Sequence, residues 1–235
     1  MERNILFGAV VALLAGSVLA ADSTPKDQIA SAARKLEDKA NYSWKTTFVV
    51  PEGSQFRRGP TEGQTEKDGY THLTMNFGDN KTEAVLKGDK AAVTNPDGGW
   101  QSLADLDNGE GPARFFAGLL RSFKAPAGQA AELAAGSKEL KKDGDVISGD
   151  LTEDGAKSLL MFRRAGGDAP QASNAKGWVK FWVKDGELSK YEFKVTGKVT
   201  FNGNDRDVDR TTTVEIKDVG TTKVDVPEDA KKKLS

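Results

Sequence analysis

The stretch GWVKFWVKDGELSKYEFKVTGKVTF, residues 177–201, alternates apolar and polar side chains along most of its length. Asp185-Gly186 divides it into two runs, and an Asp-Gly pair between two alternating runs is a strong signal for a β-hairpin. The second run, 191–201, is about twice as long as an ordinary strand. The segment therefore predicts a long antiparallel hairpin with one apolar face and one solvated face.

The same period of two recurs on both sides of this hairpin. It is clearest at 42–50, where Tyr42, Trp44, Thr46 and Phe48 share one parity. Further strands are predicted at 70–77, 82–87, 91–94, 138–140, 145–151, 211–217 and 223–226. Glycine and Asn-Gly turns separate many of them, which is typical of an antiparallel meander.

Three helices, each with a single apolar stripe, are predicted at 25–39, 113–123 and 153–162, with a short helical turn at 129–135. These helices are too few to alternate with the strands, so a parallel sheet is excluded. The prediction is an α+β fold: a strongly curved antiparallel sheet, forming an unclosed β-barrel of about 10–11 strands, with helices covering its concave face. Segment 165–175 is predicted to be a mobile loop and 228–233 a frayed end.

The chain begins with the three parts of a secretory signal peptide: a base at Arg3, an apolar run from Ile5 to Leu19, and small residues at a cleavage point after Ala20 or Ala21. The run is shorter than the roughly 20 residues needed to span a bilayer. We therefore expect residues 1–21 to be removed, and residues 22–235 to form a single domain in the periplasm, with an extracellular location as the alternative.

The composition excludes several classes of function. The sequence has no cysteine, which removes disulfides, thiolate metal sites and attachment of a lipid to sulfur. Its 34 basic and 35 acidic residues are interspersed, so nucleic acid is not an expected partner. It contains one histidine, His72, on the polar parity of its strand, and neither a Gly-x-Ser-x-Gly elbow nor a phosphate-binding glycine loop. We expect no catalytic residue, no cofactor and an exposed His72.

The acidic series Asp205, Asp207 and Asp209 resembles the start of a calcium loop but departs from it in detail. Arg210 stands where the loop requires glycine, and Ile216 where it requires a bidentate glutamate. A hairpin tip carrying surface ion pairs is the favoured interpretation, and no metal site is predicted.

A curved sheet that its own side chains cannot fill would enclose an apolar cavity, and such a cavity suits a lipid or acyl chain. The opposite interpretation, in which residues of the central helix fill the interior as ordinary core, is equally compatible with the periodicity. The predicted hydrophobic ligand contacts are the apolar parity of the strands and the central helix: Trp44, Phe48, Phe77, Phe115, Phe116, Leu119, Leu120, Phe181, Phe193 and Val195.

The order of these elements resembles the LolA/LolB and LppX-like carriers: an exported chain, an N-terminal helix, the aromatic strand 42–50, central helices, the long hairpin 177–201 and the closing segment 219–227. The resemblance implies an unclosed barrel with helices as a lid, and a soluble periplasmic carrier that is not an enzyme. The implied partners are a lipid, or the acyl chain of a lipoprotein, and a membrane-associated donor or acceptor protein.

Two other classes of function remain open from the residues. One is an envelope protein–protein interaction module with a filled core and no ligand, which would bind through its convex surface or a sheet edge. The other is an exported hydrolase that uses His72, or a pair of carboxylates that the sequence alone does not place in space.

Overall fold

The protein is described by a computed structural model over residues 23–54, 58–78, 80–161, 171–201 and 203–234. The predicted signal peptide, 1–21, lies outside these ranges. The described strands form one 11-stranded sheet in the order β6-β5-β4-β3-β2-β1-β11-β10-β9-β8-β7, with antiparallel pairing between all neighbours. The strands are β1 (Asn41–Val49), β2 (Arg58–Glu66), β3 (Thr71–Phe77), β4 (Asn80–Lys87), β5 (Lys90–Thr94), β6 (Trp100–Ser102), β7 (Lys141–Asp143), β8 (Val146–Asp150), β9 (Gln171–Lys184), β10 (Glu187–Phe201) and β11 (Asn204–Lys217).

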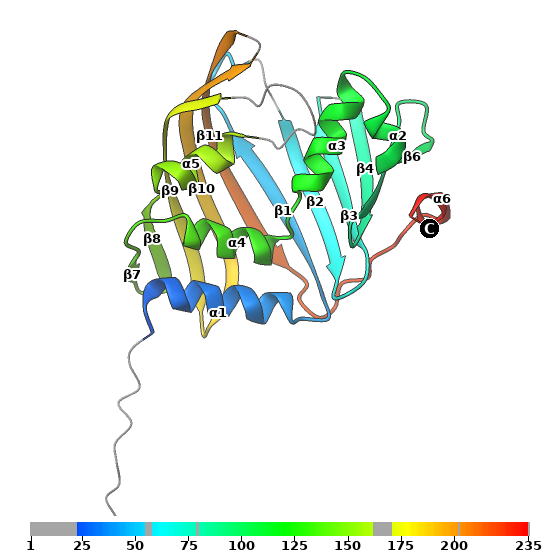
Figure 1. Cartoon of the computed structure of the whole chain (residues 1–235). Helices are drawn as coiled ribbons and strands as arrows, with labels where there is room; N and C mark the ends of the chain where they lie inside the picture. The colour runs from blue at the N-terminus through cyan, green and yellow to red at the C-terminus, as the bar shows by residue number, and fades with distance from the viewer. Residues whose placement is uncertain (1–22, 55–57, 79, 162–170, 202, 235) are drawn as a thin grey trace, which may run out of the picture.

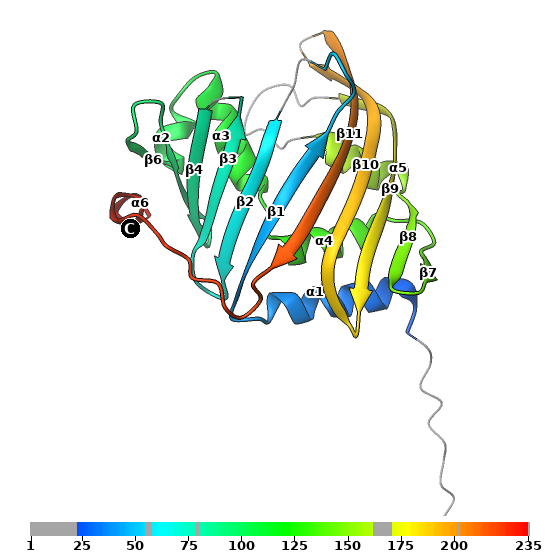
Figure 2. The same ribbon diagram turned by 180° about the vertical axis from the view of Figure 1, so that it is seen from behind.

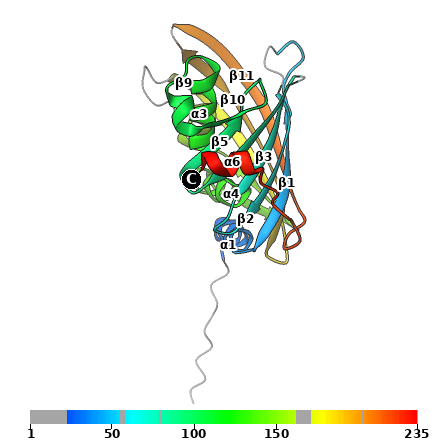
Figure 3. The same cartoon turned by 90° about the vertical axis from the view of Figure 1, so that its right-hand side faces the viewer.

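The sheet is strongly curved and is not closed into a barrel, because β6 and β7 stand at its two ends (Figures 1 and 2). The helices are α1 (Pro25–Glu37), α2 (Leu103–Asp107), α3 (Pro112–Ser122), α4 (Pro126–Ala135), α5 (Glu153–Leu160) and α6 (Glu228–Lys233). Helices α1, α3, α4 and α5 lie on the concave side, and Figure 3 shows this layer beside the curved sheet. The predicted α+β unclosed barrel is confirmed.

Local sequence explains where the long helix α1 begins and which side it buries. The hydroxyl of Thr24 accepts a hydrogen bond from the backbone N–H of Asp27, the Asp27 carboxylate accepts one from the backbone of Thr24, and Pro25 occupies the first helical position. Ile29, Ala32, Ala33 and Leu36 are buried at helical spacing. This stripe packs α1 against α4 and against β10.

Hydrophobic residues are buried on both faces of the sheet. The main core lies between the concave face and the helices, and includes Tyr191, Phe181 and Met75. A second, small cluster lies on the opposite face, where Val85 of β4 and Ala92 of β5 are covered by Val226, Ala230 and Leu234. The C-terminal segment thus folds back over the convex side of β4 and β5.

Several predicted boundaries are wrong, and packing explains them. Segment 223–226 is not a strand, and 228–233 is helix α6 rather than a frayed end, because Val226 and Ala230 are buried on the convex face. Of the predicted loop 165–175, residues 165–170 lie outside the described ranges and 171–175 are the first residues of β9. The hairpin near 138–151 is present, but its first strand begins at Lys141.

His72 lies on the face of β3 opposite the main core, as its parity predicted, but it is not exposed. Its side chain is 17% exposed, and Nε2 lies 3.4 Å from a carboxylate oxygen of Glu83 on β4. The same carboxylate group lies 2.6 Å from the Lys81 ammonium. His72 therefore lies beside the Lys81–Glu83 ion pair of the neighbouring strand, on the convex face.

Candidate functional site

A cavity of about 500 Å³ lies between the concave face of the sheet and helices α3, α4 and α5. This volume falls within the range of ordinary small-molecule pockets. Strands β1, β2, β3, β10 and β11 supply one wall, and the helices with the segments that follow them supply the other. Its lining includes Trp44, Thr46, Phe48, Thr61, Leu73, Met75, Leu119, Leu120, Phe123, Gln129, Leu133, Leu159, Tyr191, Phe193, Arg210 and Thr212.

Gly63 of β2 makes room for the indole ring of Trp44 on the neighbouring strand. The two residues are directly paired between β1 and β2. A Cβ atom on Gly63 would lie 2.1 Å from the ring atom Cζ2 of Trp44, closer than real atoms approach. The absence of a side chain at Gly63 therefore lets the ring lie across β2, where it is 4% exposed and lines the cavity.

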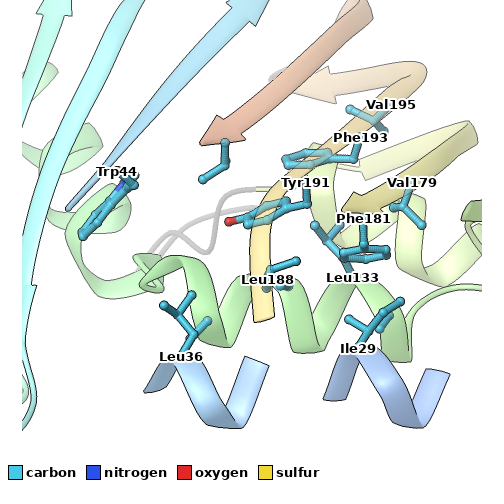
Figure 4. Packing of buried hydrophobic residues seen from close by; sticks show 14 of the residues in the cluster. Ile29, Leu36, Trp44, Leu133, Val179, Phe181, Leu188, Tyr191, Phe193 and Val195 are labelled. Carbon is cyan, nitrogen blue, oxygen red and sulfur yellow. The ribbon is translucent and has the colours of Figure 1, made fainter. Parts of the chain in front are cut away.

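Aromatic rings form much of the apolar wall. The Tyr191 and Phe193 rings of β10 lie on the side of the sheet where α4 runs, and Trp44 of β1 lies on the same side (Figure 4). Tyr191 and Phe193 are stacked with ring centroids 6.5 Å apart, and Trp44 stacks on Phe123 at 6.3 Å. Phe123 directly follows α3, so these contacts connect the helical layer to the sheet around the cavity.

The predicted contact residues divide into two groups. Trp44, Phe48, Leu119, Leu120 and Phe193 line the cavity. Phe181 and Val195 are fully buried in the packed core, while Phe77 and Phe116 meet edge to face at 5.5 Å and pack against that core. The side chain of Phe115 lies outside the described part of the structure. Parity located the buried face of the strands but did not distinguish cavity wall from packed core.

The cavity also has a polar side that sequence reasoning missed. The Arg121 guanidinium is paired with the Asp107 carboxylate, and the Lys124 ammonium with the Glu132 carboxylate. Arg210 and Thr212 of β11 add polar groups to the opposite wall, which the sheet forms. The alternation in β11 could have indicated that Arg210 shares a face with Thr212 and Val214, but the sequence was interpreted there only as a charged hairpin tip.

That hairpin tip carries surface ion pairs, as predicted. Lys198 lies 3.1 Å from the Asp205 carboxylate, and Lys194 lies 3.1 Å from that of Asp209. Both bridges join β10 to β11. No group of three or more potential metal ligands occurs among the residues that the structure describes. Within the same ranges, no helix is both long and apolar enough to cross a membrane.

This arrangement can bind an apolar chain. The cavity has room for a guest, and its walls are aromatic and aliphatic over much of their area. Each methylene group that enters contributes roughly 0.8 kcal/mol of hydrophobic stabilisation.

No protein-family model and no curated protein matches the chain. Among solved structures it is similar to the lipoprotein LppX of Mycobacterium tuberculosis, with 12% identity and a TM-score of 0.49 over 86% of this chain and 98% of that chain. It is also similar to LprF from Mycobacterium bovis, with 9% identity and a TM-score of 0.48 over 88% and 97% of the two chains. A putative outer membrane lipoprotein-sorting protein domain from Vibrio parahaemolyticus gives 10% identity and a TM-score of 0.27 over 81% and 89%.

The solved structures found therefore include LppX, which the sequence resemblance had named.

Proposed function

We propose that this protein is a soluble carrier, exported to the periplasm, that takes a lipid acyl chain or the chain of a lipidated protein into the cavity beneath α3, α4 and α5. The observation that carries the proposal is the cavity of about 500 Å³ with its wall of Trp44, Phe123 and Phe193. The proposed role is binding and transfer, with no chemical step. The signal-like segment 1–21 supports export.

The walls of the cavity suggest how a chain would enter. One wall is a continuous hydrogen-bonded sheet, while the other is a layer of short helices joined by loops. Side-chain packing and ion pairs such as Arg121–Asp107 hold these helices in place, and they can move at lower cost than strands in the centre of a sheet. We infer that loading opens the helical wall and leaves the sheet intact.

A cavity-filling substitution tests the proposal. Thr46 of β1 lines the cavity, whereas its neighbour Thr47 points to the other face and is exposed. Thr46→Trp should occupy the space that the guest needs, and Thr47→Trp adds the same side chain outside it. Wild type and Thr47→Trp should co-purify with lipid in native mass spectrometry, bind a fluorescent fatty acid and speed its transfer between vesicles. Thr46→Trp should lose all three properties while remaining folded.

Lipid content and fatty-acid binding of the wild-type protein decide whether the proposal stands. If wild-type protein from a gentle envelope extraction carries no lipid and binds no fluorescent fatty acid, the cavity is not a lipid site. Equal binding by Thr46→Trp and Thr47→Trp would place any bound probe elsewhere on the surface. Cell fractionation of the full-length chain tests the periplasmic location independently.

A further inference from the structure

Arg210 differs from the other cations of the cavity wall in what surrounds its charge. Arg121 and Lys124 each contact a carboxylate, Asp107 and Glu132 respectively. Arg210 forms no ion pair with any residue in the described part of the chain. Its Nη2 donates a hydrogen bond to the backbone carbonyl of Leu159, at 3.3 Å. Its Nε is buried and has no hydrogen-bond partner among the described residues.

A second unpaired polar group lies beside it. Thr212, two residues further along β11 and on the same face, is 3% exposed, and its Oγ1 is also buried without a partner in the described ranges. In the sheet, Thr212 is paired with Phe48 of β1 and Phe193 of β10, and all three residues line the cavity. Two neighbouring polar side chains of one strand thus have unused hydrogen-bonding capacity at the cavity wall.

Such groups are unfavourable unless something binds to them. A guanidinium remains charged at any physiological pH, even though burial lowers the pKa of Arg210 below its usual value. A buried donor without an acceptor bears the full cost of leaving water, and a buried charge bears more. The carbonyl of Leu159 satisfies one N–H group and supplies no negative charge. An oxyanion would supply both a hydrogen-bond acceptor and a negative charge, because the guanidinium fork matches a carboxylate or a phosphate.

The neighbouring residues indicate how a ligand would lie. β11 runs from the hairpin tip at Asn204 towards Val214 in the main core, so Arg210 is closer to the tip than Thr212. Beyond them the sheet wall becomes apolar, because Tyr191 and Trp44 are paired with the next residues of β11 on this face, Val214 and Ile216. A chain with one charged end could place that end at Arg210 and its tail among these rings.

We propose that Arg210, assisted by Thr212, binds the anionic head group of the ligand, so that the cavity selects amphiphiles carrying a carboxylate or a phosphate over neutral lipids of equal chain length. This inference rests on the proposed carrier function and narrows its ligand class. Arg210 fixes the orientation and identity of the guest, while the aromatic wall supplies affinity for the tail.

Three ligands with the same sixteen-carbon chain provide the test: palmitate, hexadecyl phosphate and hexadecanol, each displacing a neutral fluorescent probe at pH 8. Wild type should bind at least one of the two anions about tenfold or more tightly than the alcohol, the scale of a charge-assisted hydrogen bond. Arg210→Met, which keeps most of the side chain's length, should remove that preference and leave hexadecanol binding within about twofold. The preferred anion then identifies the head group as carboxylate or phosphate.

Two controls separate recognition from a structural role. Arg206→Met removes an exposed arginine of the same strand and parity and should leave every affinity unchanged. Arg210→Met should not lower the melting temperature of the ligand-free protein, because it removes a partly buried charge that has no counter-ion among the described residues. Arg210→Lys should retain part of the preference for anions.

Each contrary result has a distinct meaning. If hexadecanol binds as tightly as both anions in wild type, or if Arg210→Met weakens all three ligands equally, Arg210 does not recognise a head group although the carrier function stands. If none of the three ligands displaces the probe, the carrier proposal fails and this inference fails with it.

Discussion

The hydroxyl of Tyr191 donates a 2.7 Å hydrogen bond to Oε1 of Gln129, which connects the centre of the sheet to α4 at the cavity wall. Tyr191 is completely buried in the main core, and burial raises its pKa well above the ordinary value. Burial likewise raises the pKa of Tyr42, on β1, to about 12. Both phenols must therefore stay protonated for this part of the molecule to remain packed.

This burial predicts a loss of stability in alkali. In the unfolded chain both tyrosines release their protons near pH 10, whereas the folded protein retains them to a higher pH. Their contribution to stability is therefore fully present below about pH 10 and is lost as the pH rises towards the folded value of about 12 for Tyr42. Urea unfolding at a series of pH values should show the free energy of unfolding falling over this interval.

The tyrosine prediction has a direct control. Tyr42→Phe removes one of the two ionising groups, so its free energy of unfolding should fall less steeply above about pH 10 than that of wild type. Tyrosine absorbance followed during the same titration should show ionisation coinciding with unfolding. A folded protein in which all tyrosines ionise near pH 10 would contradict the assignment of these residues to the core.

Gly63 is predicted to be intolerant of any side chain because Trp44 occupies the space. Gly63→Ala should push the indole out of position and lower the free energy of unfolding by about 1–3 kcal/mol, the usual cost of overpacking. Gly128→Ala is the matched control: it lies within α4, where a Cβ would meet only Lys124 Cβ at 4.0 Å, and alanine favours a helix over glycine. Equal stability of the two variants would show that the ring does not need this site.

The contact between Gly63 and Trp44 also bears on which strands the sequence could predict. β2 was not predicted, because Arg58–Glu66 contains Pro60, two glycines and no apolar alternation. It is a strand because β1 and β3 on either side supply its hydrogen bonds, and because Gly63 accommodates a ring from β1. The long hairpin of β9 and β10 was predictable, since its alternation and its Asp-Gly turn are local signals.

Two further predictions were wrong: that 228–233 is a frayed end, and that Arg210 carries only a surface charge. Charged residues dominate 228–233 and gave the appearance of a frayed end, but Ala230 and Leu234 are buried on the convex face. In the same way, Arg210 looked like a surface charge until the register of β11 placed it opposite Val195, which is fully buried. The packing of the C-terminus on β4 and β5 joins segments far apart in the sequence, so no local pattern contains it. The position of Arg210, by contrast, follows from the alternation within β11.

The convex cluster predicts that α6 is required for stability. Ala230 is 0% exposed against Val85 and Ala92, so Ala230→Asp would bury an unpaired charge. We expect α6 to detach, with a loss of about 2 kcal/mol or more in the free energy of unfolding and rapid tryptic cleavage in the lysine-rich end. Lys232→Ala, on the exposed side of the same helix, should change neither property. A stable, protease-resistant Ala230→Asp variant would contradict the packing described for the C-terminus.

The tryptophans of the protein provide a way to locate a bound chain. Trp44 lines the cavity, whereas Trp178 and Trp182 lie on the opposite face of β9, where the ammonium groups of Lys180 and Lys190 sit 5.1 and 4.5 Å from their ring centroids. A variant that keeps only Trp44, with the other tryptophans replaced by phenylalanine, should lose fluorescence when a brominated fatty acid binds, because bromine quenches at contact. A variant that keeps only Trp182 should retain its fluorescence at the same ligand concentration. Quenching of Trp182 with Trp44 unaffected would place the ligand on the convex surface, and the cavity would then not be the binding site.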